Sequence, residues 1–330
     1  MERRRPKEEE YKEGNLSSEV KYINKLRIKE SKKRELKEFS SKLEKLRYET
    51  WAPNIDITTT HIKTEIENIT GVRVIKYSKD LEDKDNLIIY FHGGAYFAGS
   101  TDLVHNSCKY IAEQTNVTVI SVDYSLAPEF PYPIAINEGY RILKYLENEY
   151  KNIYLCGDSA GGGLATSVCI KDIEAESNIA KGLILYYPVL LIDLNDSCRD
   201  DFVWDIKEYN IDENSIDKQA IKLSILYLKD IMPFIREMYI KTEESKDNYL
   251  ISQINAPDSL LKKFPKTLIF TSEYDYLRLE AEYFYKRLRE NKIDSKCIRY
   301  LGEVHAFISK TGYNSNIIDS VNEIKEFVWK

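Results

Sequence analysis

The chain has 330 residues and a formal net charge of −6, and 43% of its residues are hydrophobic. This length and hydrophobic share suit one large α/β domain with insertions, or two domains. The negative charge argues against nucleic acid as the main partner, and no run approaches the roughly 18 apolar residues that a membrane span requires.

Cysteine and histidine usage limits the chemistry further. The five cysteines are scattered, odd in number and without C-x-x-C spacing, a pattern typical of reduced thiols in a cytoplasmic protein. The four histidines lack zinc-ligand spacing, so we expect no metal site. No apolar segment follows the charged start at Met1–Lys7, so we expect no signal peptide.

Residues 1–55 are charge-dense and predict a helical segment. Leu36, Phe39, Leu43 and Leu46 recur at the 3-4-3 spacing of an amphipathic helix, whereas roughly the first 15 residues are expected to be frayed. Two interpretations stay open for this segment. It is either a surface helix docked on the domain or part of a lid over an active site.

From residue 56 the pattern becomes that of an α/β sheet. Residues 61–66 and 72–77 alternate with period two and predict a hairpin of edge strands. Short, continuously apolar runs then alternate with helical stretches, as in the βαβ units of a doubly wound fold. The predicted strands are 87–91, 117–122, 153–156, 183–187, 267–271 and 298–301, and the predicted helices are 105–114, 134–149, 160–173, 277–291 and 317–329.

Residues 192–262 interrupt the alternation, because about 70 residues are too many for a connection without structure of its own. Apolar residues from Ile216 to Ile231 recur at helical spacing, and Pro233 should end or kink that helix. The predicted division is an N-terminal helical segment at 1–55 as part of a cap, a core at 56–191 and 263–330, and a cap insertion at 192–262.

The segment around which the chain is organised is Ile153–Gly163, where Gly157-x-Ser159-x-Gly161 fits a nucleophile elbow. A serine on a tight strand-to-helix turn has a strained backbone, and its neighbours must lack a Cβ for strand and helix to pass closely. The helix that begins there directs its first N–H groups toward charge developing beside the hydroxyl. Taken alone, the motif also fits an ordinary βα turn, so its context decides.

Upstream, the strand at 87–91 ends in His92-Gly93-Gly94-Ala95-Tyr96. A serine that attacks a carbonyl needs donors for the tetrahedral oxyanion, and glycines let this backbone approach the substrate closely. The predicted donors are the N–H groups of Gly93, Gly94 and Ala160.

Downstream, Glu273 and Asp275 end the strand after the insertion, and His305 follows the last strand. Serine, acid and histidine in this order are expected of an α/β-hydrolase. The two acids point to the same side if the strand continues, so order alone does not separate them. The shorter side chain of Asp275, further along the loop, is better placed to meet His305, and Glu273 is expected to be buried with its oxygens bound to backbone N–H or a hydroxyl.

Five motifs together resemble the hormone-sensitive-lipase-like branch of the α/β-hydrolases, over roughly residues 85–330. They are His92-Gly93-Gly94, Tyr124–Glu129, Gly157–Gly162, Glu273-x-Asp275 and His305-x-Phe307. The resemblance implies an α/β-hydrolase fold with a mostly parallel eight-stranded sheet flanked by helices, a helical cap and no cofactor. It also favours Asp275 as the triad acid, because the family places a leucine two residues after that acid and Leu277 stands there.

The activity implied by the resemblance is that of a serine carboxylesterase acting on a small ester. Ser159 would attack the carbonyl, His305 would take its proton and Asp275 would orient His305. We expect short acyl groups, because a long polar insertion and 25 tyrosines suggest a covered, partly polar pocket. A non-catalytic small-ligand-binding protein on this fold and a small-amide hydrolase remain alternatives, and no sequence feature predicts an oligomeric state.

Overall fold

The computed structural model describes residues 1–6, 11–33, 40–50, 52–80, 85–193, 195, 197, 199–243 and 247–330. Its strands are β1 (Glu2–Arg4), β2 (Lys63–Ile69), β3 (Val72–Ser78), β4 (Asn86–Phe91), β5 (Thr118–Val122), β6 (Asn152–Asp158), β7 (Ala180–Tyr186), β8 (Lys266–Tyr274) and β9 (Ser295–Val304). Its α-helices are α1 (Ser18–Lys33), α2 (Lys42–Glu49), α3 (His105–Thr115), α4 (Ile134–Leu146), α5 (Ala160–Glu174), α6 (Lys218–Tyr239), α7 (Asp258–Leu261), α8 (Arg278–Glu290) and α9 (Asn316–Trp329).

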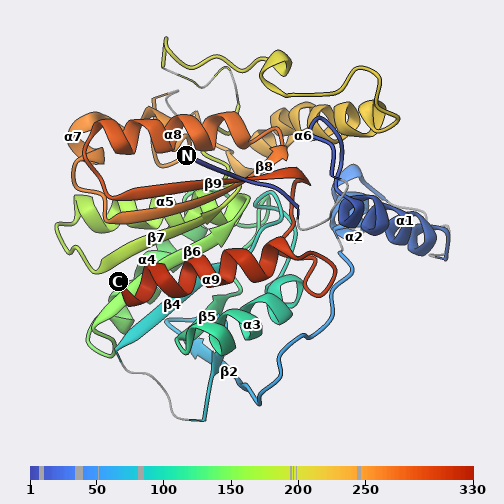
Figure 1. Cartoon of the computed structure of the whole chain (residues 1–330). Helices are drawn as coiled ribbons and strands as arrows, with labels where there is room; N and C mark the ends of the chain where they lie inside the picture. The colour runs from blue at the N-terminus through green and yellow to red at the C-terminus, as the bar shows by residue number, and fades with distance from the viewer. Residues whose placement is uncertain are drawn as a thin grey trace.

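These strands form one sheet in the order β1-β9-β8-β7-β6-β4-β5-β3-β2 (Figure 1). Neighbours from β1 to β5 are parallel, and β3 pairs antiparallel with both β5 and β2. The predicted hairpin is therefore present, but only β2 lies at the edge of the sheet. The alternation of strands and helices predicted from the sequence is confirmed.

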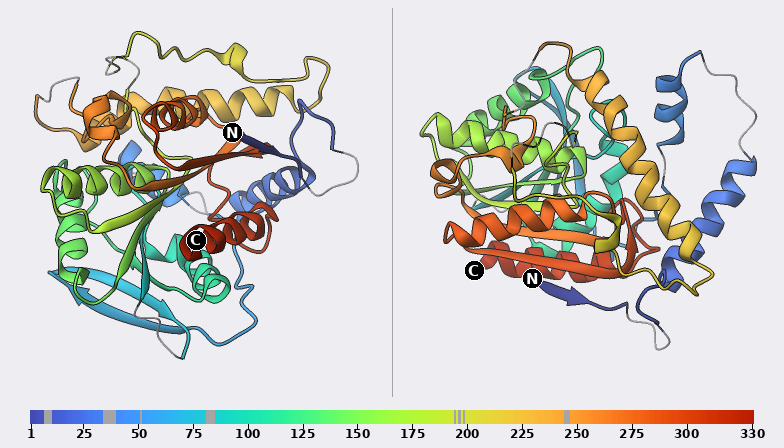
Figure 2. Two further views of the ribbon diagram at one scale, coloured as in Figure 1. Left: turned by 60° about the vertical axis from the view of Figure 1, so that its left-hand side comes forward. Right: turned by 90° about the horizontal axis from the view of Figure 1, so that it is seen from above.

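Helices cover both faces of the sheet, which explains why its central strands are continuously apolar (Figures 1 and 2). In β4, Leu87, Ile89 and Phe91 pack into the core beneath α4, α5 and α8. Ile88 and Tyr90 of the same strand point to the opposite core, beneath α3 and α9. All five residues are fully buried.

The sheet has nine strands rather than the expected eight, and residues expected to be frayed supply the ninth. Glu2–Arg4 pair in parallel with β9. The Arg4 guanidinium binds Asp319 at 2.6 Å and Glu323 at 2.5 Å, both on α9. The charged sequence of β1 carries no local strand signal. The strand exists because β9 offers a free edge and α9 offers carboxylates.

The other N-terminal expectation lies partly outside the described residues, since these exclude Leu36 and Phe39. Leu43 and Leu46 are on α2, where they are half-buried against the main core. Figure 2 shows α1 and α2 beside α6 at one end of the sheet. Among the described residues, no helix has the length and apolar character to cross a bilayer.

The segment between β7 and β8 contains the predicted helix, but Pro233 does not end it. α6 continues through Pro233 to Tyr239. Beyond the proline, Ile235 and Tyr239 are buried, and the Tyr239 ring stacks on Tyr96 with centroids 4.0 Å apart. Tertiary packing of this last turn and a half therefore outweighs the local preference of proline to stop a helix.

Candidate active site

Ser159 lies on the turn between β6 and α5. Its backbone has φ 54° and ψ −120°, a strained conformation for a residue with a side chain. The turn is tight, since a Cβ on Gly157 would lie 2.3 Å from the Gly161 carbonyl oxygen. Two hydrogen bonds of 2.9 Å fix it, from Ser159 N–H to the Tyr186 carbonyl and from Val189 N–H to the Ser159 carbonyl. The strained serine is thus held at the carboxyl end of the parallel strands.

Asp275 and His305 meet Ser159 because they directly follow the neighbouring strands β8 and β9. His305 Nε2 lies 3.0 Å from Ser159 Oγ, and His305 Nδ1 lies 2.7 Å from Asp275 Oδ2. The other carboxylate oxygen of Asp275 accepts the Leu277 N–H at 3.0 Å. If Nδ1 carries the proton and donates it to Asp275, Nε2 is free to accept the serine proton. The three predicted side chains therefore form one hydrogen-bonded line.

Glu273 lies apart from that line. Its Oε2 accepts the Gly302 N–H at 2.8 Å and the Tyr11 hydroxyl at 3.2 Å, which are the two kinds of partner that we expected. Burial raises the pKa of this carboxyl above its ordinary value. Glu273 thus joins the N-terminal residues to the end of β9.

The loop after β4 differs from the expectation at Gly93. The Gly93 N–H donates to Asp158 Oδ1 at 2.8 Å, so it is not available for an oxyanion. Asp158 also accepts the Tyr90 hydroxyl at 3.0 Å, and burial raises its pKa to about 6. The next two residues, Gly94 and Ala95, have φ of 133° and 56°.

No acceptor for the N–H groups of Gly94, Ala95 or Ala160 is found within the described residues. Ala95 is therefore a candidate donor that the sequence analysis missed. The available signal was the place of Ala95 directly after Gly94 in the same loop, but the engagement of Gly93 by a side chain of another strand was not visible in the sequence.

A cavity of about 1070 Å³, here called the cap cavity, opens at this hydrogen-bonded line. The core contributes Gly93, Gly94, Asp158, Ser159 and His305 to its lining. The remaining walls come mainly from α1, α2 and α6, including Asn24, Arg27, Lys45, Leu46, Leu228, Ile231, Met232 and Ile235. Tyr227 is the one tyrosine among the lining residues described, so tyrosine content does not make this cavity polar.

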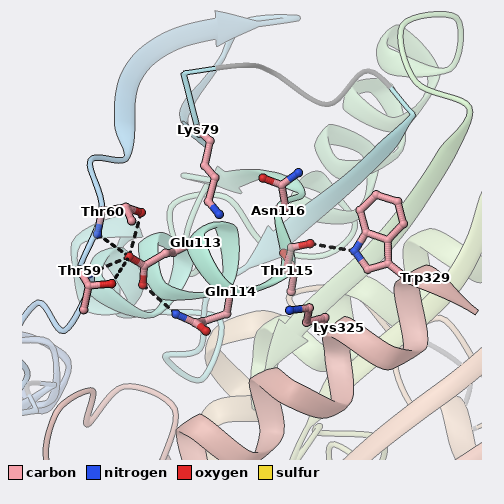
Figure 3. A pocket seen from close by; sticks show the side chains of 9 residues that line it. All are labelled: Thr59, Thr60, Lys79, Glu113, Gln114, Thr115, Asn116, Lys325 and Trp329. Atoms are coloured by element: carbon pink, nitrogen blue, oxygen red, sulfur yellow. Dashed lines mark hydrogen bonds between the residues drawn. The ribbon is translucent and has the colours of Figure 1, made fainter.

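A second cavity, of about 520 Å³, shares no lining residue with the first (Figure 3). Its carboxylate, Glu113, already accepts the backbone N–H groups of Thr59 and Thr60, each at 2.6 Å. The hydroxyls of the same two threonines also donate to Glu113. None of the predicted site residues lines this cavity, so the chemistry is to be sought at the cap cavity.

The described part of the chain contains no cluster of three or more histidine, cysteine, aspartate or glutamate side chains placed to hold a metal ion. The arrangement at the cap cavity nevertheless has the parts for nucleophilic catalysis. A strained serine is hydrogen-bonded to a histidine, and a buried acid orients that histidine. Gly94 and Ala95, whose N–H groups have no acceptor among the described residues, line the same cavity as the serine.

Fold and site together define a class, and the comparisons agree with it. Residues 88–309 match the family model described as the alpha/beta hydrolase fold. The chain therefore belongs to this family, in its hormone-sensitive-lipase and carboxylesterase type.

Among curated relatives, an arylesterase of Saccharolobus solfataricus is 27% identical over 263 residues, covering 77% of this chain and 78% of the relative. An esterase of Gibberella moniliformis is 29% identical, covering 77% of each. Among solved structures, carboxyl esterase 2 from Tuber melanosporum aligns with a TM-score of 0.70 at 23% identity, covering 95% of this chain and 100% of that one. An esterase from Pyrobaculum calidifontis aligns with a TM-score of 0.70 at 21% identity, over 95% of this chain and 98% of that one.

Proposed function

We propose that the protein is a serine carboxylesterase that hydrolyses small esters with short acyl chains. The observation that carries the proposal is the continuous line from Ser159 Oγ to His305 Nε2 at 3.0 Å and from His305 Nδ1 to Asp275 Oδ2 at 2.7 Å. The line ends in a cavity large enough for a small-molecule substrate. Esterase relatives in the same family add support.

In the proposed mechanism, Ser159 Oγ attacks the ester carbonyl while its proton moves to His305 Nε2. The negative charge on the carbonyl oxygen is stabilised by the N–H groups of Gly94, Ala95 and Ala160, the last aided by the N-terminus of α5. The imidazolium, held by Asp275, then returns its proton to the leaving alcohol. Water, deprotonated by the same base, then attacks the acyl-serine and releases the acid.

The proposed division of the chain into core and cap follows the sheet and the cavity. Residues 56–191 and 263–330 form the hydrolase core, and residues 192–262 with the helices of the first 55 residues form the cap. β1 is an exception, because it belongs to the core sheet. We place the protein in the cytoplasm, because Cys108, Cys156, Cys169 and Cys297 are unpaired and buried, as expected in a reducing compartment. The partner is a small ester rather than nucleic acid.

The first prediction tests the nucleophile. The purified protein should hydrolyse p-nitrophenyl butyrate, and Ser159→Ala should lower kcat by a factor on the order of 10³ or more, because no other oxygen can form the acyl-enzyme. Cys169→Ser, a second substitution on the buried helix α5, is the control, and its folded form should keep its activity. A folded Ser159→Ala variant with full activity contradicts the assignment.

The same assays separate the two alternative functions. A folded wild type that binds esters without turnover favours a ligand-binding protein, and turnover of p-nitroanilides favours an amide hydrolase.

The second prediction concerns the acyl chain. Among p-nitrophenyl esters from acetate to decanoate, kcat/KM should be highest at acetate or butyrate. The reason is that the cap closes over Ser159 and one wall of the cavity is polar, with Asn24, Arg27 and Ser309 among its residues. Faster turnover of decanoate than of butyrate contradicts this preference.

A further inference from the structure

Lys310 is a buried ammonium group in the wall of the cap cavity, beside His305. The residue is only 4% exposed, and it lines the cavity. Its Nζ donates to the His305 backbone carbonyl at 3.1 Å, which uses one of its three N–H donors. Burial lowers the pKa of Lys310 to about 8, so the charged form still predominates at pH 7. The proposed mechanism assigns this ammonium no task.

The two buried acids whose charges act on Lys310, Glu303 and Asp275, form no ion pair with it. The charge of Glu303 favours the ammonium from a distance. Its own oxygens, however, accept the side-chain amides of Asn314 at 2.6 Å and Asn316 at 2.8 Å, and the Val304 N–H at 3.0 Å. Among the residues that the structure describes, the His305 carbonyl is the one hydrogen-bond partner found for the Lys310 side chain.

A second cation, Arg27 of α1, lines the same cavity. The two positive charges are close enough for Arg27 to lower the pKa of Lys310. No ion pair of Arg27 is found within the described residues. Asn24 and Ser309 line the cavity on these same two segments, so this wall is polar and positively charged.

The carboxylates that line the cavity are committed elsewhere. Glu49 lies 3.8 Å from Lys45 on the same turn of α2. Asp158 holds the Gly93 N–H and the Tyr90 hydroxyl. Among the residues that the structure describes, the cavity thus presents two cations that form no ion pair, although the charges of Glu303 and Asp275 favour the Lys310 ammonium from outside hydrogen-bond range. A substrate with a negative group would supply the missing charge.

We propose that this enzyme prefers esters that carry a second, negatively charged group, such as a carboxylate, and that Lys310 and Arg27 bind this group. The inference rests on the proposed ester hydrolysis at Ser159. Lys310 Nζ contacts the backbone of His305, whose side chain contacts Ser159. A spacer of a few atoms between ester and anion therefore suffices to bridge the nucleophile and the ammonium.

The test compares matched anionic and neutral esters. Mono-p-nitrophenyl adipate is paired with its methyl ester, which places the charge on the acyl side. The butyrate ester of 4-hydroxybenzoate is paired with that of methyl 4-hydroxybenzoate, which places the charge on the alcohol side. Each rate is corrected for hydrolysis in the presence of Ser159→Ala, and the quantity compared is the ratio of kcat/KM for the anionic ester to that for the neutral ester.

In at least one pair, Lys310→Met should lower this ratio about tenfold, mainly through KM of the anionic ester, because a hydrogen-bonded charge partner is lost. Arg27→Met should lower it about threefold, since this side chain is exposed to solvent. Lys310→Arg should retain the preference. Lys25→Met, which removes an exposed charge from the same helix outside the cavity lining, should leave the ratio unchanged.

The inference is overturned if the ratio stays unchanged in both Lys310→Met and Arg27→Met. It is also overturned if Lys310→Met lowers kcat/KM equally for anionic and neutral esters, because Lys310 would then have a purely structural role. If Lys310→Met does not fold, the ratio of Arg27→Met decides. Hydrolysis of the neutral esters that depends on Ser159 supports the proposed function whatever the ratios are. Its absence contradicts that function instead.

Discussion

Glu273 and Asp275 are two residues apart, yet their carboxylates have different partners. Asp275 binds His305 and the Leu277 N–H, whereas Glu273 binds the Gly302 N–H and the Tyr11 hydroxyl. The change of environment arises where β8 ends at Tyr274 and the chain leaves the sheet. Two acids of similar chemistry can therefore serve catalysis and architecture separately.

The third prediction exploits this contrast. Asp275→Asn should lower kcat by a factor on the order of 10⁴, because the amide favours the wrong imidazole tautomer. Glu273→Gln should keep kcat within a few-fold and change mainly the free energy of unfolding, measured by urea denaturation. The two variants are matched, since each replaces one carboxylate by its amide. A loss of kcat in Glu273→Gln as large as in Asp275→Asn would refute the separation of roles.

The fourth prediction concerns Asp158 and pH. Burial raises its pKa in the folded protein from 3.8 to about 6. Between these two pH values, Asp158 is ionised in the unfolded chain but keeps its proton in the folded protein. The contribution of Asp158 to the free energy of unfolding is therefore fully present below about pH 4 and is lost as the pH rises through about 6. The total loss is about 3 kcal/mol, roughly half of it above pH 5.

Asp158→Asn removes this titration and keeps an oxygen to accept from Gly93 and Tyr90. Urea denaturation from pH 5 to 8 should therefore show the unfolding free energy of the variant rising relative to wild type up to about pH 7 and then levelling off. A difference that stays constant over the whole range contradicts the shifted titration of Asp158.

At the scale of elements, the local sequence pattern predicted those strands and helices whose own residues show the apolar pattern of a buried element. The runs at β4 to β8 are largely apolar because both faces of the sheet are covered, and the positions of these strands and of β9 were predicted within a few residues. β1 and the end of α6 could not be predicted. Both depend on distant partners, β9 and α9 for β1 and the Tyr96 ring for the last turn of α6.

The same distinction holds for the site. Ser159, Asp275 and His305 could be predicted because each follows a parallel strand, and the carboxyl ends of neighbouring strands meet. The prediction of the Gly93 N–H as an oxyanion donor was wrong, because this N–H donates to the side chain of Asp158. The charged wall of Lys310 and Arg27 could not be foreseen, since it requires the docking of α1 against the loop after β9.

At the scale of the whole molecule, the cap cavity depends on how two distant parts of the chain meet. The N-terminal segment and the insertion touch at Asp217, just before α6. Asp217 accepts the Leu16 N–H at 3.3 Å and binds Lys21 Nζ at 2.8 Å. Contacts of Lys12 with Asp212 and of Asn15 with Ser215 extend this junction. Since Leu16 itself lines the cavity, the junction sets the distance between two of its walls.

The fifth prediction tests this junction. Asp217→Ala removes the buried acceptor that holds α1 to α6, so KM for p-nitrophenyl butyrate should rise roughly fivefold, equivalent to about 1 kcal/mol of binding free energy. kcat should stay within about twofold, because the effect on binding is uniform and the Ser159–His305–Asp275 line is untouched.

Two further variants serve as controls. The KM of Asp217→Asn, which keeps an acceptor for the Leu16 N–H, should lie between those of Asp217→Ala and wild type. Asp230→Ala, an exposed acid on α6, is the matched control and should leave KM unchanged. A fall in kcat at constant KM would show instead that the junction acts on the catalytic groups rather than on the walls of the cavity.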